Sequence, residues 1–317
     1  MTKPVIYSFI DFKPEQQAQL RKIAPDYELV LASEQPEIPS QELAIVIGWR
    51  KDRAAEILAA PNLAWVQSIL AGVDYLPLAE FAQRHILVSN GSGIHVNVIS
   101  EHVLGVMLGR SRGLFAYQKD QAQQQWLPGS VPLTDLNDEK LLIFGAGHIG
   151  QMLAKRASAL GITVYGVNTA GESRPGFQKM YTQETVGPAI KAATTIVNIM
   201  PLTPTTKYYF NRDFFAKMNP QASFINVGRG ASVKTTDLVA ALQAKQLAFA
   251  ALDVFESEPL ANTSPLWQMA NVLITPHIAG QVPHFRQKLL QIVAPNLTSF
   301  VQEQQLTVNE IKPGHFY

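Results

Sequence analysis

The second half of the chain places an arginine, a glutamate and a histidine each a few residues after a short apolar run. Arg229 follows the run 222–225, Glu258 follows 248–251 and His277 follows 272–274. Such runs are typical of buried parallel strands, and open α/β sheets bind ligands beyond the carboxyl ends of their strands. A guanidinium binds anions, an imidazole carries protons, and a carboxylate pairs with either cation. This set of side chains favours acid–base chemistry on a 2-oxo or 2-hydroxy acid.

Arg229 stands between Gly228 and Gly230. Because glycine has no Cβ, this pattern favours the close approach of a ligand to the backbone. His277 is singled out among the histidines because it shares the expected sheet edge with the arginine and the glutamate. The other histidines are expected to be ordinary core or surface residues; they are His85, His95, His102, His148, His284 and His315. Trp126 and Trp267 are expected to be packing residues.

Composition limits the classes of protein to which the chain can belong. It has 317 residues, enough for two domains, with 47% hydrophobic and 16% charged residues. The formal net charge of +1 offers no basic surface for nucleic acid or an anionic membrane. The absence of cysteine excludes disulfides and thiolate chemistry, and no metal site is predicted. No leader or membrane-spanning run is present, so a cytoplasmic location is expected.

A glycine-rich turn lies between a strand and a helix near the middle of the chain. The strand 141–144 is followed by Gly145-Ala146-Gly147-His148-Ile149-Gly150 and a helix through Leu160. In this pattern the first glycine makes the tight turn, the second admits a pyrophosphate, and the third lets helix and strand pack closely. The phosphates are expected at the helix N-terminus, where free N–H groups favour anions. The candidate cofactor-binding residues here are Gly145, Gly147, His148, Ile149 and Gly150.

The strand 163–167 ends at Asn168, where an NAD-binding chain carries an acid for the ribose 2′-hydroxyl. Asparagine does not repel a 2′-phosphate, and Arg174 is close enough in sequence to bind one. The cofactor is therefore predicted to be NAD(P), with a preference for NADP, and Asn168, Thr169 and Arg174 are candidate binding residues. In the alternative reading, Asn168 hydrogen-bonds the ribose and Arg174 is a solvated loop residue.

Short apolar strands alternate with helical patterns along the whole chain, which is typical of parallel α/β sheets. The predicted fold is α/β with two doubly wound parallel-sheet domains and a cleft between them. Residues 1–98, completed by 284–317, form the smaller, flavodoxin-like substrate domain, and residues 99–283 form the Rossmann-type dinucleotide-binding domain. One long helix is predicted over 96–118, and the last helix is predicted over 283–304.

The run from Lys140 to Gly280 closely resembles the D-isomer-specific 2-hydroxyacid dehydrogenases. Besides the glycine turn it contains the segment 199–206 and the arginine, glutamate and histidine in the family's order. The segment 70–76 resembles the family's loop for the substrate carboxylate. The resemblance implies a nicotinamide cofactor and a homodimer joined through the cofactor domains.

The resemblance also implies a role for each matching residue. Arg229 would bind the substrate carboxylate and carbonyl, His277 would exchange a proton with the carbonyl oxygen, and Glu258 would hold the imidazole. The backbone N–H groups of Ala71 and Gly72 would bind the substrate carboxylate, and Asp253 would bind the nicotinamide carboxamide. The remaining cofactor-binding candidates are Pro201, Thr206, Val227 and Gly228.

Two function classes stay open. The first is an oxidoreductase that reduces a 2-oxo acid to a D-2-hydroxy acid. The second is a dinucleotide-sensing, corepressor-like binding protein with little turnover, because fold alone does not define function. Glu258 disfavours formate as substrate, and the absence of a regulatory region disfavours a phosphoglycerate dehydrogenase. The substrate side chain is left open among glyoxylate, hydroxypyruvate, pyruvate and larger 2-oxo acids.

Overall fold

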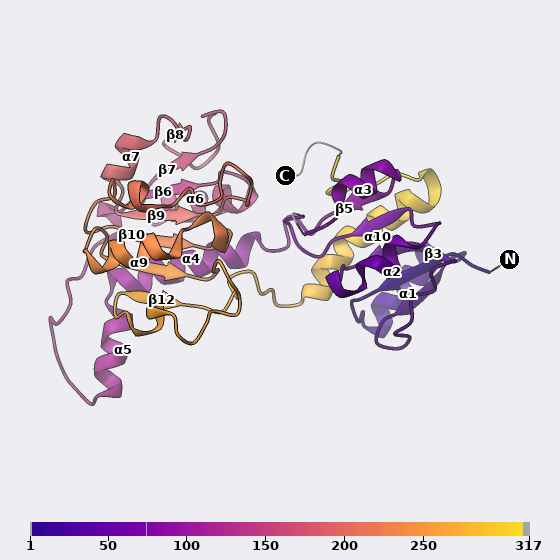
Figure 1. The fold of residues 1–317 in the computed structure, drawn as a ribbon, viewed down its shortest axis with the longest axis horizontal. Helices are drawn as coiled ribbons and strands as arrows, with labels where there is room; N and C mark the ends of the chain where they lie inside the picture. The colour runs from indigo at the N-terminus through magenta and orange to yellow at the C-terminus, as the bar shows by residue number, and fades with distance from the viewer. Residues whose placement is uncertain (1, 74, 313–317) are drawn as a thin grey trace. The chain divides into compact units, whose positions relative to one another are not determined.

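The computed structural model describes residues 2–73 and 75–312, which form two compact units (Figure 1). Unit 1 comprises the residues up to His95 and those from Val282 onward, and unit 2 comprises Val96–Gln281. The borders expected from the sequence, at 98/99 and 283/284, fall two or three residues later than these.

Unit 1 is a parallel sheet of five short strands covered by helices. The sheet order is β2-β1-β3-β4-β5, the order of flavodoxin-like folds. Helix α1 begins at a proline, and the Gln16 side chain accepts a hydrogen bond from the Lys13 N–H just before it. The elements are β1 (Val5–Ser8), α1 (Pro14–Ile23), β2 (Glu28–Leu31), β3 (Leu43–Ile47), α2 (Ala54–Leu58), β4 (Trp65–Gln67), α3 (Leu78–Gln83), β5 (Leu87–Ser89) and α10 (Phe285–Glu303).

The strands of unit 1 are buried on both faces, which explains why they read as continuous apolar runs. Along β3, Ile45 and Ile47 belong to the core shared with α1 and α10, whereas Leu43 and Val46 belong to the core shared with α2 and α3. Helix α10 contributes Leu289, Val293, Leu297 and Phe300 to the first of these cores. The last helix of the chain therefore packs on the sheet formed by the N-terminal residues.

Unit 2 is a seven-stranded parallel sheet in the order β12-β11-β10-β9-β6-β7-β8. Counted from β6, its first six strands follow the Rossmann order 3-2-1-4-5-6, with β12 added at the edge. The elements are α4 (Val96–Ser111), α5 (Leu114–Ala122), β6 (Lys140–Phe144), α6 (His148–Ala159), β7 (Thr163–Val167), β8 (Lys179–Tyr181), α7 (Gly187–Ala192), β9 (Thr195–Asn198), α8 (Arg212–Phe215), β10 (Ser223–Asn226), α9 (Thr235–Gln243), β11 (Phe249–Leu252) and β12 (Val272–Ile274). Leu142 and Phe144 of β6 face one core, and Leu141 and Ile143 face the other.

The two parallel α/β sheets confirm the predicted fold class, and three local predictions were wrong. The helix expected over 96–118 is two helices, because Gly113 adopts a left-handed conformation (φ 65°) that an α-helix does not continue through. Trp126 and Trp267 do not pack in a core, since they are 93% and 51% exposed. Strands β5, β8 and β9 were not predicted, although β4 and β12, which are equally short, were. Among the described residues, no helix is both long and apolar enough to span a membrane.

Candidate active site

The carboxyl edge of the unit 2 sheet brings together the residues that the sequence singled out in this unit. All the strand pairs of this sheet are parallel, so their carboxyl ends lie along one edge. The glycine turn follows β6, Arg229 follows β10, and Glu258 follows β11. His277 follows β12 at the end of the row.

His277 and Glu258 form a hydrogen-bonded pair. The ring Nδ1 of His277 lies 2.7 Å from Oε2 of Glu258, and the two side chains are 57% and 36% exposed. The other carboxylate oxygen of Glu258 accepts a hydrogen bond from the backbone N–H of Phe255 at 3.0 Å. The carboxylate is thus oriented by the backbone, and it orients the imidazole in turn.

The turn that carries His277 is wrapped around the buried carboxylate of Asp253, which is 2% exposed. That carboxylate accepts hydrogen bonds from Oγ1 of Thr275 at 2.6 Å and from the N–H groups of Ile278 and Ala279 at 2.9 Å each. The backbone oxygen of Asp253 also accepts the N–H of His277 at 2.9 Å. His277 itself has a left-handed conformation (φ 54°), which costs a non-glycine residue free energy. The contacts of Asp253 hold it in that conformation.

A buried network of hydrogen bonds holds the carbonyl group of Arg229. Asn198 and Asn226 end the neighbouring strands β9 and β10, and Nδ2 of Asn198 donates to Oδ1 of Asn226 at 2.9 Å and to Oγ of Ser232 at 2.8 Å. Ser232 and Asn226 both donate to the carbonyl oxygen of Arg229, at 2.6 Å and 3.3 Å. The three supporting residues are fully buried. Sequence reasoning missed them, although a polar residue at the end of an apolar strand was a signal.

The glycines beside Arg229 lie against the backbone of neighbouring loops. A Cβ on Gly228 would lie 2.8 Å from the carbonyl oxygen of Met200, and a Cβ on Gly230 would lie 1.9 Å from that of Phe255. Both glycines therefore admit the backbone of a neighbouring loop. They let the loops after β9, β10 and β11 pack side by side.

The turn after β6 has the shape that a dinucleotide pyrophosphate requires. Gly145 has a φ of 106°, and a Cβ on Gly150 would lie 2.1 Å from the carbonyl oxygen of Gly145. Nothing lies within 4 Å of the place where a Cβ of Gly147 would be. Gly147 is also the first residue before α6 and supplies no side-chain cap, which leaves the N–H groups at His148 and Ile149 for an anion. These residues fit the phosphates of a nicotinamide dinucleotide.

The loop after β7 is held by its own hydrogen bonds. Asn168 donates from Nδ2 to the carbonyl oxygen of Glu172 at 2.9 Å, and its buried Oδ1 has no partner among the described residues. Arg174 pairs with the Glu172 carboxylate at 3.3 Å, with both side chains substantially exposed. Exposed pairs of this kind are worth about 0–1 kcal/mol, so Arg174 can leave Glu172 for a stronger anion. Thr169 is exposed beside them.

The other cofactor candidates of unit 2 lie in the loops after β9 and β10. The hydroxyl of Thr206 donates to the carbonyl oxygen of Pro201 at 2.7 Å and accepts the N–H of Thr203 at 2.7 Å. Val227 is buried, and its N–H donates to the carbonyl oxygen of Asn198 at 3.1 Å. In the structure Thr206 therefore shapes the loop that begins at Pro201.

In unit 1, Ala71 and Gly72 lie in the loop after β4, at its carboxyl end. Both residues are half-buried, and Leu70 beside them is 44% exposed. Asp74, within the same motif, lies outside the described residues.

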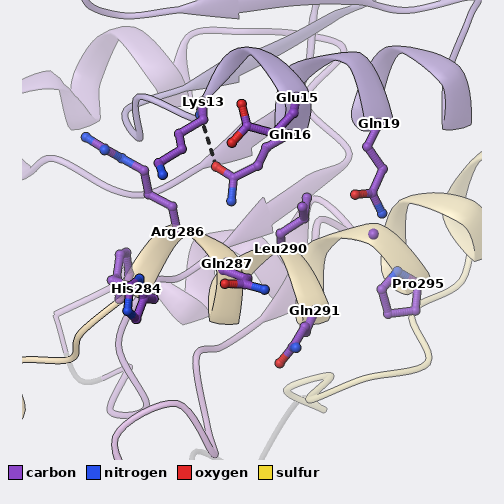
Figure 2. Close-up of a pocket in the computed structure, with 12 residues that line it drawn as sticks. Lys13, Glu15, Gln16, Gln19, His284, Arg286, Gln287, Leu290, Gln291 and Pro295 are labelled. Carbon is purple, nitrogen blue, oxygen red and sulfur yellow. Dashed lines mark hydrogen bonds between the residues drawn. The ribbon is translucent and has the colours of Figure 1, made fainter.

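Unit 1 also contains a polar groove between α1 and α10 with a cavity volume of about 1050 Å³ (Figure 2). Lys13 and Arg286 lie toward one end of it, and Gln19 and Pro295 lie toward the other. Its lining is mostly long, exposed side chains without a hydrogen-bonded acid–base pair among the described residues. The groove is therefore not counted with the candidate active site.

Known proteins resemble this chain over most of its length. Residues 104–279 match the family model of the D-isomer specific 2-hydroxyacid dehydrogenase, NAD binding domain. A glyoxylate/hydroxypyruvate reductase B from Shigella boydii serotype 4 is 30% identical over 255 residues, which are 78% of this chain and 78% of that protein.

Two solved structures extend the likeness over nearly the whole chain. A phosphoglycerate dehydrogenase from Lactobacillus plantarum is 41% identical, with a TM-score of 0.59 over 97% of this chain and 100% of that one. An NADPH-dependent glyoxylate/hydroxypyruvate reductase from Sinorhizobium meliloti, solved with NADP and sulfate, is 27% identical with a TM-score of 0.84 over 100% of both chains.

The fold and the site define an oxidoreductase with a Rossmann-type unit for NAD(P). The match of more than half of the chain to the family model makes the assignment specific. The chain belongs to the D-isomer specific 2-hydroxyacid dehydrogenase family.

Proposed function

We propose that the protein reduces a small 2-oxo acid to the D-2-hydroxy acid, with His277 as the acid/base, Glu258 as its partner and Arg229 as the substrate-binding cation. The observation that carries this proposal is the 2.7 Å contact between Nδ1 of His277 and the Glu258 carboxylate, on a turn fixed by a buried acid. His85 and His284 are also left-handed, so the backbone conformation alone does not single out His277; its contact with Glu258 and the hydrogen bonds of its turn to Asp253 do.

The chemistry assigned to each residue follows from its position. Because Nδ1 of His277 is held by Glu258, Nε2 is the ring nitrogen that gives a proton to the carbonyl oxygen of the substrate. Glu258 stabilises the positive charge of the ring before that transfer. The guanidinium of Arg229 binds the carboxylate of the substrate through parallel hydrogen bonds. The chemistry that a nicotinamide cofactor would supply, when bound, is the hydride for the carbonyl carbon, which together with the proton from His277 would balance the two-electron reduction.

The cofactor is proposed to be held by the glycine turn at Gly145–Gly150 and by the loop after β7, with NADP preferred over NAD. Asn168 has no charge to repel a 2′-phosphate, and Arg174 is bound only to the exposed Glu172. The Sinorhizobium meliloti relative, which was solved with NADP, supports the same preference. Asp253 remains a candidate for the nicotinamide carboxamide, since a carboxylate accepts about four hydrogen bonds and three are in place.

Glyoxylate and hydroxypyruvate are the proposed substrates, because they are the substrates in the names of the Shigella boydii and Sinorhizobium meliloti relatives. A phosphorylated three-carbon acid is the second candidate. The Lactobacillus plantarum structure named a phosphoglycerate dehydrogenase is 41% identical and is matched over its full length. This likeness keeps a phosphorylated acid as a candidate, against the expectation drawn from the sequence.

A homodimer through unit 2 is proposed as the assembly. Helix α5, which packs on unit 2 through Phe115, and the segment after it extend outward from unit 2 (Figure 1). They expose Leu114, Trp126, Leu127 and Leu133 by 46–93%. A set of large exposed apolar side chains on one segment supports an interface between two protein chains. Light scattering after gel filtration would measure the mass, and a monomer at micromolar concentration would contradict this proposal.

The first experiment is the absorbance of the nicotinamide band with a panel of 2-oxo acids, run in parallel with NADH and NADPH. Oxidation of either cofactor supports the enzyme, and replacement of His277 by alanine should lower turnover by ~10² or more with cofactor affinity unchanged. Cofactor binding without turnover on any acid would favour the dinucleotide-sensing, corepressor-like protein. Normal turnover in the alanine variant would contradict the acid/base assignment.

A further inference from the structure

The loop 69–73 of unit 1 is fastened at two consecutive carbonyl groups. The oxygen of Leu70 accepts the N–H of Gly91 at 2.9 Å, and the oxygen of Ala71 accepts Nδ2 of Asn90 at 2.7 Å. Both donors come from the segment that follows the neighbouring strand β5. The two carbonyl groups therefore point toward the same segment.

The direction of the next two N–H groups follows from the geometry of the peptide bond. In a planar trans peptide the C=O and N–H bonds point in opposite directions. The N–H of Ala71 shares a peptide with the oxygen of Leu70, and the N–H of Gly72 shares one with the oxygen of Ala71. Both N–H groups consequently point away from Asn90 and Gly91, and neither donates to an acceptor among the described residues. Successive N–H groups on one side of the chain form an anion-binding concavity.

Every polar atom of Asn90 makes a hydrogen bond. It is 7% exposed, its Oδ1 accepts the N–H of Ser92 at 3.0 Å, and its backbone exchanges two hydrogen bonds with Asn309, at 3.1 and 3.2 Å. Nδ2 of Asn309 also donates to the oxygen of Ser92 at 2.8 Å. Gly91 allows the close approach, since a Cβ there would lie 2.4 Å from the carbonyl oxygen of Ile69.

We propose that Asn90 is a positioning residue for the substrate carboxylate. Its side-chain amide holds the carbonyl of Ala71 so that the N–H groups of Ala71 and Gly72 face the anion, and Asn309 holds Asn90 in turn. This inference rests on the proposed function, because it needs a carboxylate substrate bound at loop 69–73. Asn90 makes no contact with the reacting atoms and acts through the loop alone.

The test compares Asn90→Asp with the wild type. Aspartate keeps the acceptor for Ser92 but replaces the donor with an oxygen that repels the carbonyl of Ala71. A group that orients the carboxylate site contributes the same binding free energy to the ground state and to the transition state. The KM for glyoxylate should therefore rise ~10-fold, while kcat and the KM for the cofactor should stay within ~3-fold of the wild type. The matched control is Asn62→Asp, which removes an exposed amide-to-carbonyl bond to Gln41 (2.7 Å) in the same unit and should change neither constant. An unchanged substrate KM in Asn90→Asp would overturn the proposal.

A second variant and a second measurement separate positioning from the added charge and from the proposed function. Asn309→Ala introduces no charge and frees the segment 90–92, so it should raise the substrate KM ~3-fold. Amide hydrogen exchange of Leu70 and Gly91, whose N–H groups donate to Oγ of Ser68 and to the oxygen of Leu70, should speed up in Asn90→Asp without substrate, whatever the reaction is. Faster exchange with no turnover of any 2-oxo acid by the wild type would refute the proposed function and leave the fastening of the loop established. Unchanged exchange would refute the role of Asn90, even in an active enzyme.

Discussion

Replacement of Asp253 by asparagine should disable the turn that carries His277. The aspartate accepts three hydrogen bonds, and an asparagine can keep only those that reach its single oxygen. The N–H of Ala279, which is 4% exposed, would then face an NH₂ group. An unsatisfied buried donor costs ~1–3 kcal/mol, and the two remaining bonds each lose about 1 kcal/mol of charge assistance. Because asparagine also avoids the burial of a charge, we expect a net destabilisation of the turn of ~2–3 kcal/mol.

This free energy is comparable to the cost of the left-handed conformation of His277, about 1–3 kcal/mol. Once the hydrogen bonds of Asp253 no longer compensate that cost, the backbone of His277 relaxes and its imidazole ring moves away from the carboxylate of Glu258. A displacement of about 1 Å in a catalytic group lowers the rate ~10²-fold. We therefore expect kcat/KM for the best 2-oxo acid to fall ~100-fold in Asp253→Asn.

Steady-state kinetics, cofactor binding followed by nicotinamide fluorescence, and thermal unfolding together test this reasoning. The cofactor Kd should change less than ~3-fold if the aspartate acts through the turn. Asp237→Asn is the matched control, because Asp237 accepts one backbone N–H, that of Arg212 at 3.0 Å, in an exposed part of unit 2. Wild-type kcat/KM in Asp253→Asn would refute the role of the turn. A Kd weakened ~10-fold with kcat preserved would instead assign Asp253 to the cofactor.

Three further substitutions test other parts of the site. Glu258→Gln should lower kcat/KM ~3- to 10-fold in steady-state assays, because a neutral partner stabilises the imidazolium less and partial exposure limits the effect. Gly150→Ala should weaken cofactor binding ~10-fold or more, measured by fluorescence titration, since the Cβ of the new alanine would lie 2.1 Å from the carbonyl oxygen of Gly145. The control Gly187→Ala, whose Cβ would have no atom within 4 Å, should leave cofactor binding unchanged. Asn168→Asp should shift the ratio of kcat/KM values toward NADH ~10-fold, because a carboxylate repels a 2′-phosphate, and an unchanged ratio would place cofactor selection elsewhere.

The strands that form the two sheets were most readily predictable where they contain four or five consecutive apolar residues, as in Leu43–Ile47 and after the lysine of Lys140–Phe144. Burial on both faces produces such runs, so composition alone marks them. The short strand Lys179–Tyr181 lies at the sheet edge and contains a lysine, so no run marks it. The break at Gly113 depends on a left-handed backbone that glycine permits but does not require.

Residues that do chemistry and residues that hold them in place differ in how far the sequence reveals them. Arg229, Glu258 and His277 are visible because each is an ionisable side chain a few residues after an apolar run that is typical of a strand. Asn226 also interrupts such a run, yet its partner Asn198 lies 28 residues away and is brought beside it only by the pairing of β9 with β10. The contact of Asn309 with Asn90 joins positions 219 residues apart. Such contacts follow from strand order and chain return, which local patterns do not contain.

The exposure of the paired side chains explains why the buried residues matter to function. His277 and Glu258 are 57% and 36% exposed, and an exposed ion pair contributes little free energy with which to hold its own geometry. Their alignment must therefore come from the backbone, and the backbone of the histidine turn is fixed by the buried carboxylate of Asp253. In such a site the residues least accessible to substrate determine whether the accessible ones are aligned. The substitution Asp253→Asn is consequently expected to lower kcat/KM about as strongly, ~100-fold, as the replacement of His277 by alanine.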